Sequence, residues 1–106
     1  MSNPPYPDKR GTNGVGKDID GTPHPFVILD EIVRPQSTNP NKLIYLQKIQ
    51  FDLDGKIEFR LAYYIIGKKP RMAGKWVFGQ YATMMNPDDF EFLVKEAKIR
   101  GWMGNL

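Results

Sequence analysis

The sequence predicts an α+β fold in which a four-stranded antiparallel sheet is followed by one C-terminal helix, in the order ββββα. Two observations carry this prediction. Apolar side chains alternate along residues 42–52 and 56–66, which is the period of a β-strand. A stretch after residue 86 instead combines a helix-start signal with apolar side chains at helical spacing. We also expect a dimer, because domains of this size often gain buried surface by association.

The two alternating segments are predicted to form one long hairpin. A three-residue loop, Leu53-Asp54-Gly55, would pair Phe51 with Ile57 and keep the apolar side chains on one face. It would also place Gly55 at the turn position that needs a left-handed residue. The same register continues to the far end of the hairpin, where it pairs Tyr45 with Tyr63 and Leu43 with Ile65.

The opposite face of this hairpin would carry Lys48 directly across from Arg60, close to Tyr64. Two like charges opposite each other are mildly destabilising, which raises the question of whether they serve a ligand. A solvated outer face is the competing explanation, because antiparallel sheets commonly leave one face in water.

Two further strands complete the predicted sheet. Residues 26–34 form an apolar run that ends before Pro35, and the turn-forming residues 36–41 connect this strand to the hairpin. The fourth strand is expected over residues 75–84, where Gly79 marks a bulge or a close approach of two backbones.

The helix is predicted to begin after the capping residue Asn86, with Pro87 at its first position, and to end near Arg100 before Gly101. The side chains expected to pack on the sheet are Phe90, Leu93, Val94 and Ala97. Phe92 and Ile99 lie on the other side of the helix and form a second apolar stripe, which requires a cover of its own. That cover is either the C-terminal Trp102 and Met103 or a second subunit, and we favour a dimer interface through Phe92 and Ile99.

Residues 1–25 are expected to be a disordered tail, which leaves residues 26–106 as the single domain. The tail has five prolines and four glycines and too few large apolar side chains to offset the entropy of ordering it. His24, the only histidine, lies in this tail and has no partner in the sequence for acid–base or metal chemistry. No metal site and no cofactor are expected.

Composition narrows the class of protein further. The chain has no cysteine, hence no disulfide framework and no thiolate metal site. No apolar run reaches the length of a membrane span, so no membrane association is expected. We expect a cytoplasmic or nucleoid-associated protein, or a nuclear one if the source is eukaryotic.

The most informative stretch lies between Glu58 and Asp88, which contains no acidic residue. Cations interleaved with aromatic rings are typical of single-stranded nucleic-acid binding, in which cations contact phosphates and rings stack on bases. With the neighbouring hairpin positions, the predicted contacts are Lys48, Lys56, Arg60, Tyr64, Lys68, Lys69, Arg71, Lys75 and Trp76.

Two other functions are alternatives to nucleic-acid binding. An enzyme is not expected, although Asp54, Glu58 and Arg60 could form a small metal-dependent nuclease site around the hairpin turn. A protein–protein adaptor is the stronger alternative. It would use an apolar patch of Ile44, Leu46 and Tyr64 together with the second helix stripe, and the lysines would only confer solubility.

A resemblance to a known family supports the first function. The run DGKIEFRLAYYI, the basic loop GKKPRMAGKW and the helix start NPDDFEFLVKEA resemble the single-stranded-DNA-binding domain of transcriptional positive cofactor four and its bacterial relatives. The match covers roughly residues 42–100. Whirly and Pur-type domains share the same ββββα order.

This resemblance implies a homodimer built through the helices, with single strands of DNA, or less readily RNA, lying across the curved sheet. It also implies a role in transcription regulation or DNA maintenance with little sequence specificity. The positions that match the family's basic contacts are Lys56, Lys68, Lys69, Arg71 and Lys75. One departure is Ala62, which stands where the family has a basic residue, with Arg60 two positions away.

Overall fold

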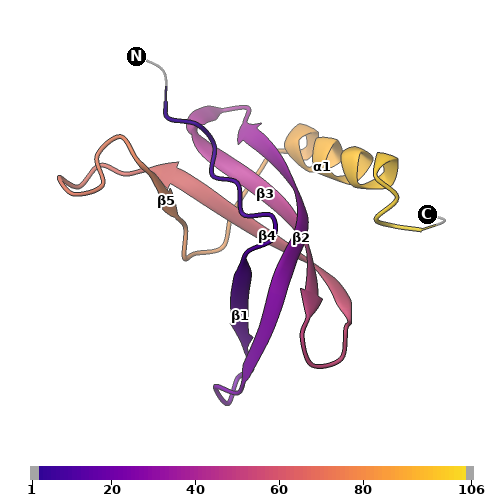
Figure 1. The fold of residues 1–106 in the computed structure, drawn as a ribbon. Helices are drawn as coiled ribbons and strands as arrows, with labels where there is room; N and C mark the ends of the chain where they lie inside the picture. The colour runs from indigo at the N-terminus through magenta and orange to yellow at the C-terminus, as the bar shows by residue number, and fades with distance from the viewer. Residues whose placement is uncertain (1–2, 105–106) are drawn as a thin grey trace.

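Five antiparallel strands form one curled, half-barrel sheet, and a single helix packs against it (Figure 1). The computed structural model describes residues 3–104; the outer ends of the predicted tail and domain, residues 1–2 and 105–106, lie outside the described residues. The elements are β1 (Asn13–Lys17), β2 (Pro23–Gln36), β3 (Asn39–Phe51), β4 (Ile57–Ile66), β5 (Trp76–Phe78) and α1 (Pro87–Ile99). The α+β class is confirmed, whereas the predicted count of four strands is wrong.

The additional strand, β1, lies inside the predicted tail and pairs with β2. Pairing requires only backbone hydrogen bonds, so a segment with few apolar side chains can form a strand once a neighbour is in place. Glycine helps here, since a Cβ on Gly14 would collide with the ring of Phe26. The prediction of a tail is therefore wrong for Asn13–Lys17 and for the first residues of β2.

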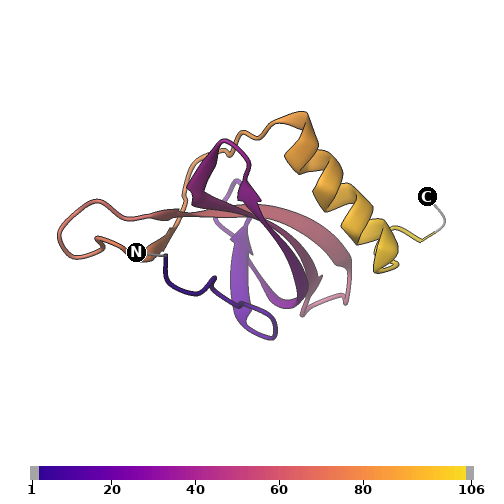
Figure 2. The same ribbon diagram turned by 90° about the horizontal axis from the view of Figure 1, so that it is seen from above.

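The N-terminal segment, residues 3–12, crosses the concave face of the sheet, opposite the face that carries α1 (Figure 2). The Tyr45 hydroxyl donates to the Pro7 carbonyl at 2.7 Å, and the Trp76 indole N–H donates to the Pro4 carbonyl at 2.9 Å. The backbone N–H of Lys9 donates to the Glu31 carboxylate at 2.8 Å. These bonds join the segment to three different strands.

The β3–β4 hairpin forms in a register that differs from the predicted one. Gln50 pairs with Ile57 and Lys48 with Phe59, one position away from a three-residue loop, so the turn has four residues, Asp52–Gly55. Gly55 does take a positive φ of 72°, as predicted. The register prediction failed because it assumed one buried face, whereas β3 is buried on both faces from Leu43 to Gln47.

The two faces of β3 belong to two separate cores. On the convex face, α1 covers a cluster of Ile32, Ile44, Leu46, Leu93 and Ala97. On the concave face, a second cluster contains Leu43, Tyr45, Ala62 and Tyr64. A third, smaller cluster lies between β2 and β3 and contains Phe26, Ile28 and Ile49.

The other predicted strands change in length. β2 runs through Pro35, which was expected to end it, and pairs with β3 across a register shift next to that proline, where prolines are tolerated. β5 is much shorter than the predicted residues 75–84. Gly79 does mark a close approach, because a Cβ there would overlap the ring of Tyr63.

Helix α1 begins and ends where local signals predict. The Asn86 side chain accepts a hydrogen bond from the Asp89 N–H, and Gly101 after the C-cap has a φ of 75°. Leu93 and Ala97 are buried as expected, but Phe90 is exposed, because the buried face of the helix follows Asp89, Leu93 and Ala97 and leaves Phe90 outside it.

A polar network fixes the start of the helix to the β2–β3 turn. The buried Asp89 carboxylate accepts hydrogen bonds from the Arg34 guanidinium at 3.0 Å and from the Ser37 N–H at 3.1 Å. Burial by itself would raise the pKa of Asp89, but these bonds and the bond from the Ser37 hydroxyl outweigh it and hold the pKa below its ordinary value. Among residues 3–104, no helix combines the length and apolar character needed to cross a membrane.

Candidate nucleic-acid interface

The β4–β5 loop, residues 67–75, protrudes from the body of the sheet (Figure 1). It carries four exposed cations, and none of them forms an ion pair with any residue between 3 and 104. These cations are Lys68, Lys69, Arg71 and Lys75. Uncompensated cations on a projecting loop can approach a phosphate backbone without losing partners of their own.

The shape of this loop is set by its two glycines. The N–H of Gly67 donates to the Lys75 carbonyl at 2.9 Å and closes the base of the loop. Gly67 leaves no room for a Cβ against the backbone of Met72, and Gly74 has a φ of 76°. The sequence therefore folds the loop back on itself and holds its basic side chains at the surface.

Exposed aromatic and basic groups continue from the loop along the chain. Tyr81 is 85% exposed, and its N–H donates to the Tyr63 hydroxyl at 3.1 Å. The ammonium group of Lys42 lies 5.0 Å from the centroid of the Tyr63 ring and donates to the Met84 carbonyl. Burial lowers the pKa of Lys42. Lys42 and Tyr81 were not among the predicted contacts, although Tyr81 belongs to the aromatic residues of the acid-free stretch.

Arg60 occupies the concave face between two aromatic rings. Its guanidinium carbon lies 5.3 Å from the ring centroids of both Phe26 and Phe78. It is half-buried, has no carboxylate partner among the described residues, and its pKa is lowered by burial. The small open cavity around it, of about 350 Å³, is also lined by Lys9 and Gln47.

Tyr64 is not available for stacking, contrary to the prediction. It is 7% exposed and packs edge-on against Tyr45 and Phe78, with ring centroids 5.1 and 5.4 Å away. Burial raises the pKa of its hydroxyl. Because Ile44 and Leu46 are buried as well, on the opposite face, the apolar patch of the adaptor alternative does not exist as a surface.

Lys48 and Arg60 do not face each other either. In the observed register Lys48 pairs with Phe59 and Arg60 with Gln47, so the two cations lie on opposite faces of the sheet. Lys56 follows the hairpin turn, at the opposite end of β4 from the basic loop. The structure therefore groups only the loop cations among the predicted contacts.

Trp76 lies next to the basic loop, but its side chain already contacts the N-terminal segment. Its indole N–H bonds to the N-terminal segment, and Tyr6 packs edge-on against its ring at 6.0 Å. These contacts and the concave core leave the ring only partly exposed.

The two side chains of the predicted dimer stripe on α1, Phe92 and Ile99, differ in exposure. The Arg34 guanidinium lies 4.5 Å from the centroid of the Phe92 ring and covers it in part, whereas Ile99 is 78% exposed. Trp102 and Met103 pack on the convex core instead and leave Ile99 uncovered. A dimer through this stripe stays a prediction.

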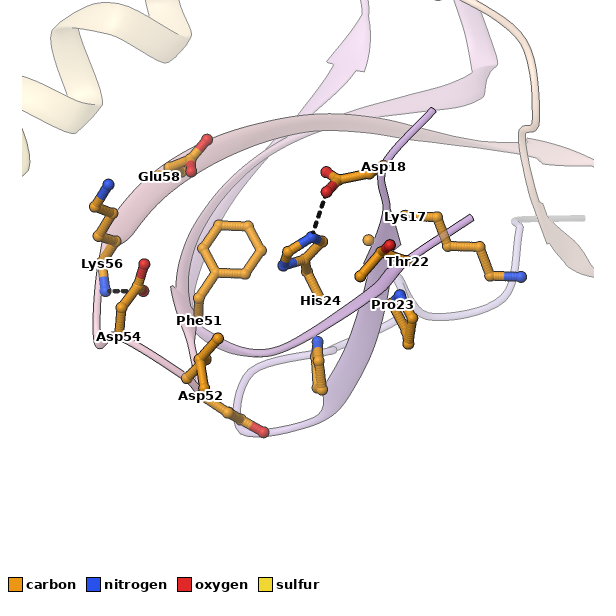
Figure 3. Close-up of a pocket in the computed structure, with 13 residues that line it drawn as sticks. Lys17, Asp18, Thr22, Pro23, His24, Phe51, Asp52, Asp54, Lys56 and Glu58 are labelled. Atoms are coloured by element: carbon orange, nitrogen blue, oxygen red, sulfur yellow. Dashed lines mark hydrogen bonds and ion pairs between the residues drawn. The ribbon is translucent and has the colours of Figure 1, made fainter. Parts of the chain in front are cut away.

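A second, larger open cavity, of about 810 Å³, lies at the opposite end of the molecule, between the β1–β2 and β3–β4 turns (Figure 3). Nε2 of His24 lies 2.8 Å from Oδ2 of Asp18 there, a partner that the sequence did not suggest. The ring of Phe51 lies beside this pair. Acidic side chains predominate in the cavity, with Asp18, Asp52, Asp54 and Glu58 against Lys17 and Lys56.

The residues of the nuclease alternative are divided between the two cavities. Asp54 and Glu58 line the large one, whereas Arg60 lines the small one. Within residues 3–104, no group of three histidine, aspartate or glutamate side chains is placed to hold a metal ion.

In comparisons with known proteins, no family model, no curated protein and no solved structure matches this chain.

Proposed function

We propose that this protein binds single-stranded nucleic acid with little sequence preference, through the β4–β5 loop and the aromatic surface next to it. The observation that carries the proposal is the protruding loop with Lys68, Lys69, Arg71 and Lys75, none of which has a carboxylate partner among the described residues. Cations of this kind attract phosphates without a prior ion pair to break.

The charge distribution of the molecule supports this location. Four acidic residues, Asp18, Asp52, Asp54 and Glu58, line the large cavity at the other end of the sheet, where they would repel phosphates. A nucleic-acid strand is therefore attracted to one end of the sheet.

The neighbouring rings supply a means to hold bases. Tyr81 is largely exposed, and Phe78 is partly exposed with its ring against the Arg60 guanidinium. Stacking on exposed rings tolerates any base, which agrees with weak sequence preference. The choice of DNA over RNA rests on the family resemblance.

The first test is a titration of a labelled single-stranded oligonucleotide at several salt concentrations. Changing Lys68, Lys69 and Arg71 together to alanine should reduce the slope of log affinity against log salt by about 2, since each lost phosphate contact contributes about 0.7. A matched control changes Lys17, Lys95 and Lys98 to alanine, which removes the same charge elsewhere and should leave the slope near the wild-type value.

Tyr81→Ala separates stacking from charge. It should weaken binding by ~1–3 kcal/mol at every salt concentration and leave the slope unchanged. If the triple loop variant binds as tightly as the wild type with the same slope, the loop serves only solubility and the proposal is wrong.

A further inference from the structure

The outer edge of β4 is open over most of its length. β5 pairs only with Tyr64–Ile66, so the segment Ile57–Ala62 has no neighbouring strand on that side among the described residues. The open segment is bounded by the hairpin turn at one end and by Gly79, whose N–H donates to the Tyr63 carbonyl, at the other.

The backbone groups that point out of this edge can be identified. In an antiparallel strand the N–H and C=O of one residue point to the same side, and the side alternates along the chain. The Tyr63 carbonyl bonds outward to Gly79, whereas the Lys56 carbonyl bonds inward to Phe51. The outward residues of the open segment are therefore Ile57, Phe59 and Leu61.

The same residues expose apolar side chains on the convex face. Ile57, Phe59 and Leu61 are between 41 and 46% exposed, and Trp102 contacts the Phe59 ring without covering it. Natural sheets protect an open edge with prolines, bulges or charged side chains. Residues 57–62 contain no proline, no lysine and no bulge in their pairing with β3, and their two charged side chains, Glu58 and Arg60, have opposite signs. Such an edge can accept a strand that places an opposite charge against each of them.

We propose that two copies of this chain pair through β4 in antiparallel fashion, about a two-fold axis at Phe59. In this register Phe59 lies opposite Phe59 of the second copy, and Ile57 opposite Leu61. All of these residues point outward, so their N–H and C=O groups can form a regular ladder. The proposal does not depend on nucleic-acid binding.

Charge complementarity selects this register over its neighbours. With the axis at Phe59, Glu58 of each copy lies opposite Arg60 of the other, which gives two pairs of opposite charge on the concave face. An axis at Glu58 would place two carboxylates opposite each other, and an axis at Arg60 would place two guanidinium groups opposite each other. Arg60 contacts the rings of Phe26 and Phe78 but has no carboxylate partner among residues 3–104, so a carboxylate from a second copy would break no existing ion pair.

The length of the open edge of β4 also agrees with an axis at Phe59. With the axis at Phe59, Gly55 of one copy falls opposite Tyr63 of the other, which is where Gly79 already occupies the edge. The new ladder therefore covers residues 57–61 of both copies and ends where the existing structure prevents it from continuing.

A charge-swap experiment on the full chain tests the register directly. Glu58→Arg creates two like-charged pairs in the homodimer, and Arg60→Glu does the same with the opposite sign. We expect each variant alone to dissociate about tenfold more readily than the wild type, or more, by sedimentation velocity. An equimolar mixture of the two restores both attractive pairs and should form heterodimers, which native mass spectrometry of a mass-tagged copy detects.

A second pair of variants avoids the concave core, in case Arg60→Glu does not fold. One chain carries Ile57→Lys with Leu61→Lys, and the other carries Ile57→Glu with Leu61→Glu, all at exposed positions. Each chain alone should be monomeric, and only their mixture should associate.

Three results would overturn the proposal. A wild-type chain that is monomeric at high micromolar concentration has no such interface. Swap variants that associate as the wild type does would exclude this register. Loss of the dimer in a Phe92→Ser, Ile99→Ser variant, with no effect of the swaps, would assign the interface to α1.

Discussion

β3 and β4 pair with each other and carry the same alternation of apolar side chains, yet they differ in how far they are buried. β3 is covered on the convex face by α1 and on the concave face by the N-terminal segment. β4 is covered only in part on the concave face, and most of its convex side chains remain exposed, namely Ile57, Phe59, Leu61 and Ile65. Apolar alternation therefore indicates that a strand has two different faces, but the elements that pack on them decide which faces are buried.

The largest effect should come from truncating a side chain under α1. Leu93→Ala should lower the free energy of unfolding by about 2–5 kcal/mol, because Leu93 is fully buried in the convex core. Leu61→Ala on the uncovered convex face of β4 should cost less than about 1 kcal/mol, because the side chain is already half in water. Urea denaturation at a concentration where the chain is monomeric measures both; equal costs would mean that α1 does not define the convex core.

Removing the N-terminal segment should leave the concave face of β3 only partly covered, as the concave face of β4 already is. A chain that starts at Asn13 loses, among other bonds to the sheet, those made by the Tyr45 hydroxyl, the Trp76 indole and the Lys9 N–H, which are worth about 3 kcal/mol together at about 1 kcal/mol each. For a domain of this size, that corresponds to a fall in Tm of roughly ten degrees or more.

Tyr45→Phe provides the control for this truncation. It should destabilise the full-length chain and have little effect on the shortened one, since its bond partner Pro7 is then absent. An unchanged Tm after truncation would restore the original prediction that this segment is a dispensable tail.

A smaller effect is expected where α1 is anchored to the β2–β3 turn. Asp89→Asn should cost about 1–3 kcal/mol at neutral pH, because the variant loses the charged partner of Arg34 in a buried position. The pKa of Asp89 is lower in the folded chain than its ordinary value of 3.8, so its contribution is complete above that value and is lost as the pH falls through the folded pKa.

The difference in stability between wild type and Asp89→Asn should therefore shrink as the pH is lowered from about 5 to about 2. Thermal unfolding across this range measures it. A difference that stays constant over the whole range would show that the carboxylate charge contributes nothing to the anchor.

The sequence by itself determined the features that depend on a few neighbouring residues. The cap at Asn86, the helix end at Gly101 and the left-handed turn at Gly55 follow from backbone sterics and local hydrogen bonds, and all three were predicted. The cations of residues 67–75 were also evident, because an acid-free stretch is a property of composition alone.

Only the tertiary structure decided which side chains of the candidate interface are accessible. Tyr64 and Tyr81 are both aromatic residues of the acid-free stretch, but the concave core buries the first and leaves the second exposed. The hairpin register was also decided by tertiary packing. Because β3 is covered on both faces, it lacks the difference in burial between faces on which the prediction relied. The observed register places Lys48 and Arg60 on opposite faces of the sheet. β1 formed for the same reason, since a strand of weak propensity needs only the edge of β2 to pair with.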